Sequence, residues 1–171
     1  MRSFASGSYL LSDARFEVRL VYTGFLALVV IGFVTMAVFQ LMHIGPTPAR
    51  IAVYYRGGER EMAMVFPKTF RELVEVTHFH AFIIGVVYLV LAHLFLATGA
   101  PEWMKRAGVG VTFAGLAGDM LGIWLIRYVS AAFAYTQVLF WGFEWAGFAA
   151  LVFYPLREMW FRQGRNDLPP E

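Results

Sequence analysis

Three histidines bracket one loop of a chain that is otherwise mostly apolar. His43 falls at the end of the first long apolar run, and His78 and His80 lie near the start of the second. Ionisable side chains are costly inside a membrane, so histidines at such positions are candidates for function. Imidazole is also the usual protein ligand of haem iron, copper and zinc. The pattern therefore indicates a metal or cofactor site near one membrane face.

The composition indicates an integral membrane protein. Of the 171 residues, 59% are hydrophobic and only 15% are charged, which is typical of membrane proteins. The sequence contains no cysteine, which excludes disulfides, iron–sulfur clusters, covalently attached c-type haem and thiol catalysis. The formal net charge is +2 and the basic residues lie near the ends of the apolar runs. Nothing in this pattern supports nucleic-acid binding.

Four apolar runs are long enough to span a bilayer and predict an all-α protein. The predicted helices cover about residues 20–43, 70–98, 107–129 and 135–160. Thr69 and Glu72 have the spacing of a capping box, which places the start of the second helix directly after Thr69. The joins 100–106 and 130–134 are short, so consecutive helices should be antiparallel neighbours. We expect a single integral membrane domain, residues 1–171, folded as an up-down-up-down four-helix bundle.

The loop of residues 44–69 carries the signal for a short additional helix. Thr47-Pro48 can begin this helix and Gly57-Gly58 can end it, and its mixed tyrosine and aliphatic residues indicate a position at the membrane surface. Eight of the 14 lysines and arginines fall on the side of the termini and six on the side of the loop. This bias places both termini in the cytoplasm and the three histidines near the outer face. The expected location is a bacterial inner membrane.

The best candidate ligand pair for haem iron is His43 with His78. Adjacent antiparallel helices should bring them to similar depth, as bis-histidine ligation in a four-helix bundle requires. His80 could replace His78 if the second helix is rotated, because the two residues lie about 200° apart around the helix axis. His93 lies near the opposite face and could be a sole haem ligand or a proton-transfer residue. We expect at most one bis-histidine haem b.

A purely structural role and a metal site are two alternative roles for the histidines. A histidine at a helix end, such as His43, can simply satisfy terminal carbonyl groups. A copper or zinc site built from His43, His78 and His80 would require the second helix to distort. Glu75, one turn from His78, could then accept a hydrogen bond from a ligating imidazole.

Three further ionisable residues fall inside the predicted spans. Asp119 lies in the middle of the third helix, Glu144 near the middle of the fourth, and Arg127 at the outer end of the third. Carboxylates at this depth must pair, protonate or face a polar cavity. They could form a proton path, help to hold a quinone head group, or only join helices by hydrogen bonds. Arg127 could pair with a haem propionate or extend to the interface.

Several segments resemble an uncharacterised family of small bacterial four-helix integral membrane proteins. They are Tyr55-Arg56-Gly57, Phe66-Pro67-Lys68, Glu75-Val76-Thr77-His78-Phe79-His80, Trp124-Leu125-Ile126-Arg127-Tyr128-Val129-Ser130, Phe133-Ala134-Tyr135, Pro155-Leu156 and Glu158-Met159-Trp160. The resemblance covers about residues 20–160 and implies the four-helix fold, while no activity is established for the family. The likeness to b-type cytochromes is one of architecture and rests on analogy alone.

The sequence favours an electron-transfer subunit over an independent enzyme. It holds no nucleophile–base constellation, phosphate loop or dinucleotide fingerprint. We expect a cytochrome b-like membrane subunit that binds haem through His43 and His78 and has other membrane redox subunits, a quinone or a cytochrome as partners. The alternatives are a cofactor-free structural or assembly subunit and a histidine-based metal-handling membrane protein.

Overall fold

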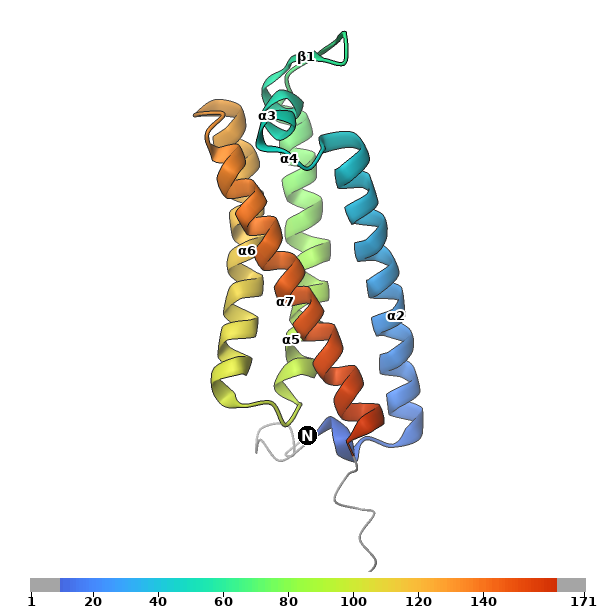
Figure 1. Ribbon diagram of the computed structural model, residues 1–171. Coiled ribbons are helices and arrows are strands. Elements are labelled where there is room, and N and C mark those ends of the chain that lie inside the picture. Colours follow the sequence, from blue (N-terminus) through green and yellow to red (C-terminus); the bar gives the residue numbers. More distant parts are fainter. Residues whose placement is uncertain (1–9, 163–171) are drawn as a thin grey trace, which may run out of the picture.

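The computed structural model of the protein describes residues 10–162, and within them four long helical segments run side by side (Figure 1). These segments are α2 (Phe16–Phe39) with the π-helical turn η2 (Gln40–Ile44), α4 (Phe70–Phe79) with η3 (His80–Ile84) and α5 (Gly85–Leu96), α6 (Glu102–Tyr128), and α7 (Phe133–Phe161). A short 3-10 turn, η1 (Leu11–Asp13), precedes α2. Each long segment is apolar enough to cross a bilayer. The prediction of an all-α four-helix membrane bundle is confirmed, and the helices imply contact with lipid.

Two helices, α2 and α6, begin earlier in the chain than the sequence predicts, and both have charged residues in their first turns. α2 begins at Phe16 instead of residue 20, and the Arg19 side chain donates hydrogen bonds to the carbonyl oxygens of Ala14 (2.7 Å) and Ser12 (2.8 Å). α6 begins at Glu102 instead of residue 107. Hydropathy marks only the part of a helix that lies in hydrocarbon, so polar turns beyond it are missed.

The second helical segment begins where the sequence predicts. Thr69 Oγ1 accepts a hydrogen bond from the backbone N–H of Glu72 (3.2 Å), and a Glu72 carboxylate oxygen accepts one from the backbone N–H of Thr69 (2.7 Å). The predicted capping box is therefore confirmed. It satisfies two backbone donors that a helix start would otherwise leave without partners.

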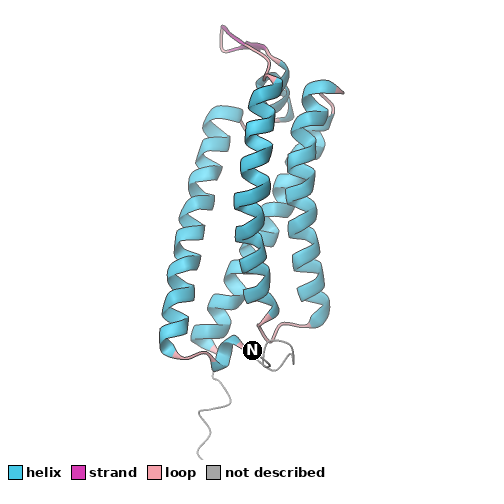
Figure 2. Ribbon diagram, turned by 180° about the vertical axis from the view of Figure 1, so that it is seen from behind, coloured by secondary structure: helices cyan, strands magenta, loops and turns pink. Residues whose placement is uncertain are grey.

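The loop before α4 contains a helix that the sequence predicts and a hairpin that it does not. The short helix α3 (Pro48–Arg56) lies between the Thr47 cap and Gly57, whose φ of 81° ends it. Strands β1 (Gly58–Arg60) and β2 (Ala63–Val65) follow as an antiparallel pair at the end of the molecule (Figure 2). Their turn places Glu61 and Met62 at positive φ, which glycine, asparagine and aspartate usually adopt.

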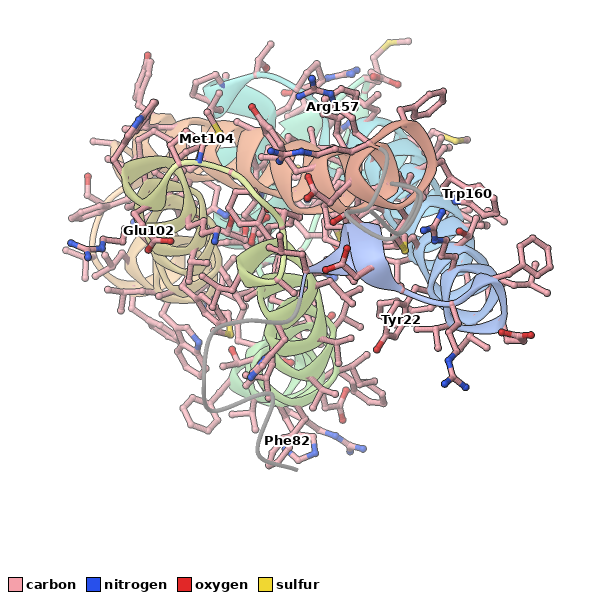
Figure 3. The ribbon with its side chains drawn as sticks, turned by 90° about the horizontal axis from the view of Figure 1, so that it is seen from below. Tyr22, Phe82, Glu102, Met104, Arg157 and Trp160 are labelled. Atoms are coloured by element: carbon pink, nitrogen blue, oxygen red, sulfur yellow. The ribbon has the colours of Figure 1, made fainter. Side chains whose placement is uncertain are left out.

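The bundle has two distinct ends. One carries α3 and the hairpin and is called the α3 end below; the described chain begins and ends at the other (Figure 1). That the end with the termini faces the cytoplasm stays a prediction. Viewed along the bundle, the side chain of Phe82 points outward from it (Figure 3). Exposed apolar residues of this kind occur along all four helical segments, as a lipid-facing surface requires.

Glycines bring α6 and α7 close together. Gly115, Gly118 and Gly122 are buried on the face of α6 that meets α7. A Cβ atom added at Gly115 would lie 2.9 Å from the backbone nitrogen of Glu144. Small residues allow such close backbone approach between membrane helices, where van der Waals packing drives association.

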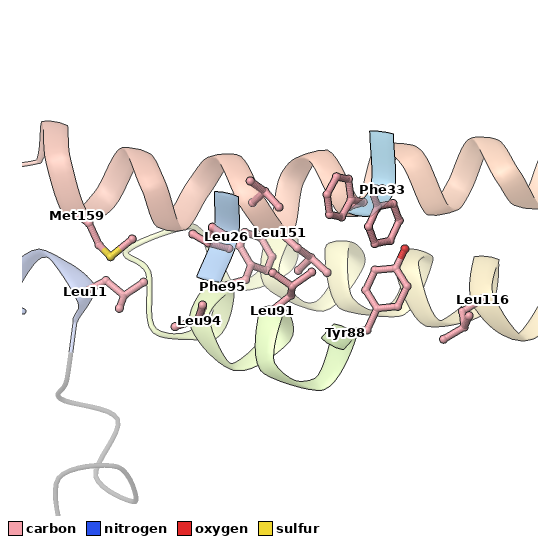
Figure 4. Packing of buried hydrophobic residues seen from close by; sticks show 12 residues of the cluster. Leu11, Leu26, Phe33, Tyr88, Leu91, Leu94, Phe95, Leu116, Leu151 and Met159 are labelled. Carbon is pink, nitrogen blue, oxygen red and sulfur yellow. The ribbon is translucent and has the colours of Figure 1, made fainter. Parts of the chain in front are cut away.

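Aromatic packing attaches α2 to the other helices. Only Leu26 and Phe33 of α2 are buried. The Phe33 ring stacks on Phe148 of α7 with 3.7 Å between ring centroids, and meets Tyr88 of α5 edge-on at 5.8 Å. These rings lie in the apolar cluster that runs along the interior of the bundle (Figure 4). α2 is therefore held along a narrow stripe and exposes most of its surface.

The close approach of α6 and α7 predicts opposite effects on stability for two glycine-to-alanine substitutions in α6. Gly115→Ala should lower the free energy of unfolding by about 1–3 kcal/mol, because the new Cβ meets backbone atoms that cannot move aside independently. Gly110→Ala is the matched control, since its Cβ would have no neighbour within 4 Å, and alanine favours a helix over glycine. Thermal unfolding in detergent measures both. Equal melting temperatures for the two variants would contradict the packing described.

Candidate functional site

A cavity of about 350 Å³ lies at the α3 end of the bundle. All four long helical segments contribute to its walls, through α2 and η2, α4 and η3, α6, and α7. The helix α3 and the loop before α4 complete them. The apolar lining consists of Met36, Phe39, Ile44, Leu73, Val76 and Ile123. The polar and aromatic lining consists of Gln40, Tyr54, Tyr55, Lys68, Glu72, Glu75, His80, Asp119 and Trp141. An apolar wall with a few convergent polar groups is typical of small-molecule sites.

Asp119 is the carboxylate at the α6 wall of the cavity. Its Oδ1 accepts a hydrogen bond from the indole N–H of Trp141 (2.7 Å) and another from the amide of Gln137, both on α7. Gln137 is fully buried. Since both donors bind Oδ1, Oδ2 has no hydrogen-bond partner among residues 10–162. Asp119 of α6 is thus joined to α7 through one of its carboxylate oxygens.

His80 faces the same cavity from the second helical segment. Its Nδ1 lies 2.8 Å from the carbonyl oxygen of Val76, so Nδ1 carries the proton and donates it. In the neutral form of the ring, Nε2 is then the nitrogen that can accept a hydrogen bond or bind a metal. His80 is also the first residue of the π-helical turn η3, and such turns occur frequently at functional sites. His80 therefore lines the cavity with its Nδ1 engaged by the backbone.

The other histidines lie outside the cavity. His78 is exposed beside the ring of Phe82, with 5.1 Å between ring centroids, and His43 is exposed and stacked on Phe39 at 4.4 Å. Neither His43 nor His78 lines this cavity. Because His78 and His80 project about 200° apart, the inward position of His80 turns His78 outward. A role of His43 and His78 as haem ligands stays a prediction.

His93 lies on the same helical segment toward the opposite end of the bundle. Its side chain is exposed, and its Nδ1 is 2.7 Å from the carbonyl oxygen of Leu89. Within residues 10–162, no group of three or more histidines and carboxylates could hold a metal ion. The hypothesis of a three-histidine copper or zinc site therefore has no preformed counterpart in the described part of the chain.

Arg127 fastens the loop and does not line the cavity. Its Nε donates to the carbonyl oxygen of Lys68 (2.7 Å). Arg56 similarly donates to the carbonyl oxygen of Ile126 (2.9 Å), and Arg60 to that of His43 (2.7 Å). Cationic side chains at helix C-termini satisfy the last carbonyl groups. The three arginines thus tie the loop to the ends of α6 and η2, while the predicted propionate role of Arg127 stays a prediction.

Glu144 is separate from the cavity. It is only 4% exposed and lies in the middle of α7, packed beside Gly115 of α6. Another polar group of the bundle interior is the hydroxyl group of Tyr88, which is fully buried in the apolar cluster and has no hydrogen-bond partner among the described residues. Asp119 and Glu144 therefore occupy different environments, one at a polar cavity and the other in the tightly packed interface. A proton path through both stays a prediction.

Tyr55 and Lys68 are among the cavity residues that the sequence does not predict. Tyr55 of α3 is buried, and its burial, together with the charge of Asp119, raises the pKa of its hydroxyl group, so it stays a neutral donor. Lys68 pairs with Glu72 at 2.9 Å and lies over the ring of Tyr54 at 4.8 Å. The amphipathic pattern of α3 could have indicated that Tyr55 is buried, because α3 buries one face, with Ile51 and Tyr55, against the bundle.

Together these features define an integral membrane protein with four spanning helices and a polar cavity at one end. The chain matches the Aq_1264_TM family, described as a transmembrane helical domain, over residues 45–166. The protein belongs to this family. The matched region begins directly after η2 and includes His80, Asp119 and Trp141. No curated protein and no solved structure matches the chain.

The two hydrogen bonds at Asp119 predict that two substitutions of this residue differ in their effect on stability. Asp119→Leu leaves the Trp141 and Gln137 donors without an acceptor and should cost about 1–3 kcal/mol of folding free energy. Asp119→Asn keeps an acceptor at Oδ1 and should retain most of the stability. Thermal unfolding of both variants in the same detergent gives the comparison. An Asp119→Leu protein as stable as Asp119→Asn would show that these bonds do not join the helices.

Proposed function

We propose that this protein is a quinone-binding subunit of a membrane redox assembly, and that the cavity at the α3 end holds the quinone head group. The observation that carries this proposal is that His80 and Asp119 line one cavity between membrane-spanning helices. A lipid-soluble ligand can reach such a cavity from the bilayer. The Met36, Phe39 and Val76 side chains supply apolar contacts for a ring.

The polar groups match the chemistry of a para-quinone. Its two carbonyl oxygens accept hydrogen bonds, and on reduction they become hydroxyl groups that donate them. His80 Nε2 can accept from a quinol hydroxyl group, or donate to a quinone oxygen when the imidazole is protonated. Tyr55, kept neutral by its surroundings, is a further donor. Such a mixed set can bind both redox forms of the head group.

Proton exchange is the step that these residues would perform. Oxidation of a quinol releases two protons and two electrons. The protons pass to His80 Nε2 and to the Asp119 carboxylate, and the two electrons pass singly to a haem or iron–sulfur centre of a neighbouring subunit. Reduction of the quinone reverses both transfers. The contribution of this chain is to bind the head group, orient it and move protons.

A b-type haem is the second candidate for the same cavity, and His80, in place of His78, would be the histidine that holds its iron. The hydrogen bond from His80 Nδ1 to Val76 favours it, because ligating histidines usually donate their other ring N–H to a fixed acceptor. Met36 lines the cavity from α2 and could supply a thioether as the second ligand. Bound haem would supply one-electron transfer, which fits a cytochrome b-like subunit.

Replacing His80 should weaken quinone binding. His80→Leu should raise the Kd of a short-chain benzoquinone about tenfold, the equivalent of one hydrogen bond. His78→Leu is the matched control, since it removes an exposed histidine from the same helical segment and should leave the Kd within about twofold. Quenching of tryptophan fluorescence reports binding, because Trp141 lines the cavity. Equal affinities for the two variants would contradict the head-group site.

The haem candidate makes a different prediction. A reduced-minus-oxidised spectrum of the purified protein should show a b-type α band, which His80→Ala abolishes and His78→Ala preserves. Met36→Leu should convert a six-coordinate spectrum to a five-coordinate one. A colourless protein that does not bind added haemin would eliminate this candidate. Failure of both quinone and haem binding would instead favour a cofactor-free assembly subunit.

A further inference from the structure

An apolar groove adjoins the polar cavity. Its volume is about 370 Å³, and it lies between α2 and the second helical segment. Phe25, Leu28, Gly32 and Met36 line it from α2, and Ile84 and Val87 line it from η3 and α5. No charged side chain of the described residues contributes to its lining. The groove can therefore accept only an apolar occupant.

The groove and the cavity meet at Met36. This side chain lines both spaces. From Met36 the groove follows α2 to Phe25, a distance of about 16 Å or three helical turns. A polar cavity at the α3 end and an apolar groove along α2 thus have one wall residue in common. The combined shape matches a molecule with a compact polar head and a long apolar tail.

We infer that the groove holds the isoprenoid tail of the quinone whose head group occupies the cavity. The inference rests on the proposed function, because a tail in the groove places the covalently attached head beside Met36 and hence at the cavity. The same apolar lining could accept a phospholipid acyl chain, but such a chain would have no reason to depend on the head-group residues. A tailed quinone should therefore bind more tightly than a tailless one.

Two glycines of α2 provide the test. A Cβ atom added at either Gly32 or Gly24 would have no neighbour within 4 Å, so both positions accept a larger side chain without a clash at the helix. Only Gly32 lines the groove. Gly32→Leu therefore fills the groove, and Gly24→Leu makes the same chemical change on the same helix outside it.

The experiment compares the Kd of a tailless benzoquinone with that of an analogue carrying several isoprene units, at one detergent concentration. In the unmodified protein the tail should strengthen binding at least about tenfold. Gly32→Leu should remove most of this advantage and leave the tailless Kd unchanged. Gly24→Leu should leave both values unchanged, which separates binding in the groove from partition into the micelle.

The outcomes separate the groove from the head-group site. A tail advantage that persists in Gly32→Leu, with binding still dependent on His80, overturns the groove inference and leaves the head-group proposal intact. Release of co-purified phospholipid by Gly32→Leu, without a change in the tail advantage, overturns it in favour of an acyl chain. Binding of both quinones that does not depend on His80 overturns the groove inference together with the proposed function.

Discussion

The hydrogen bonds to Asp119 are the constraint on which the α3 end of the bundle depends. A carboxylate within a membrane-spanning helix must be satisfied by its neighbours, and here two donors of α7 bind one of its oxygens. This arrangement needs α6 and α7 to be close, which the glycines of α6 permit. Asp119 also lines the cavity. The same contact therefore stabilises the helix pair and creates the polar wall of the site.

The remainder of the site depends on how the loop is held. Arg56, Arg60 and Arg127 donate to carbonyl oxygens at helix ends and at Lys68, which places α3 over the end of the bundle. Tyr55 is thereby buried against the helices. The capping box fixes the start of α4, and the turn η3 follows with His80 at its first position. Local backbone chemistry thus positions His80, which lines the cavity together with Asp119.

The sequence predicts the four spans and the capped start of α4, because hydropathy and capping are local properties of the chain. It could not decide between His78 and His80, since the rotation of a helix is set by its neighbours. The hairpin escaped prediction because Glu61 and Met62 occupy positive-φ positions without glycine or asparagine. Tyr55 was missed because a tyrosine at a membrane surface is ordinary, and only the folded loop brings it to the cavity that Asp119 lines.

Photoaffinity labelling with an azidoquinone tests the central claim most directly. The protein in lipid nanodiscs would be irradiated with the probe, digested and mapped by mass spectrometry, with and without excess unlabelled quinone. The account predicts labelling of peptides that contain Met36, Phe39 and Val76, prevented by the unlabelled competitor and weakened in His80→Leu. Labelling spread over the lipid-facing helices, unaffected by the competitor, would contradict a quinone site in the cavity.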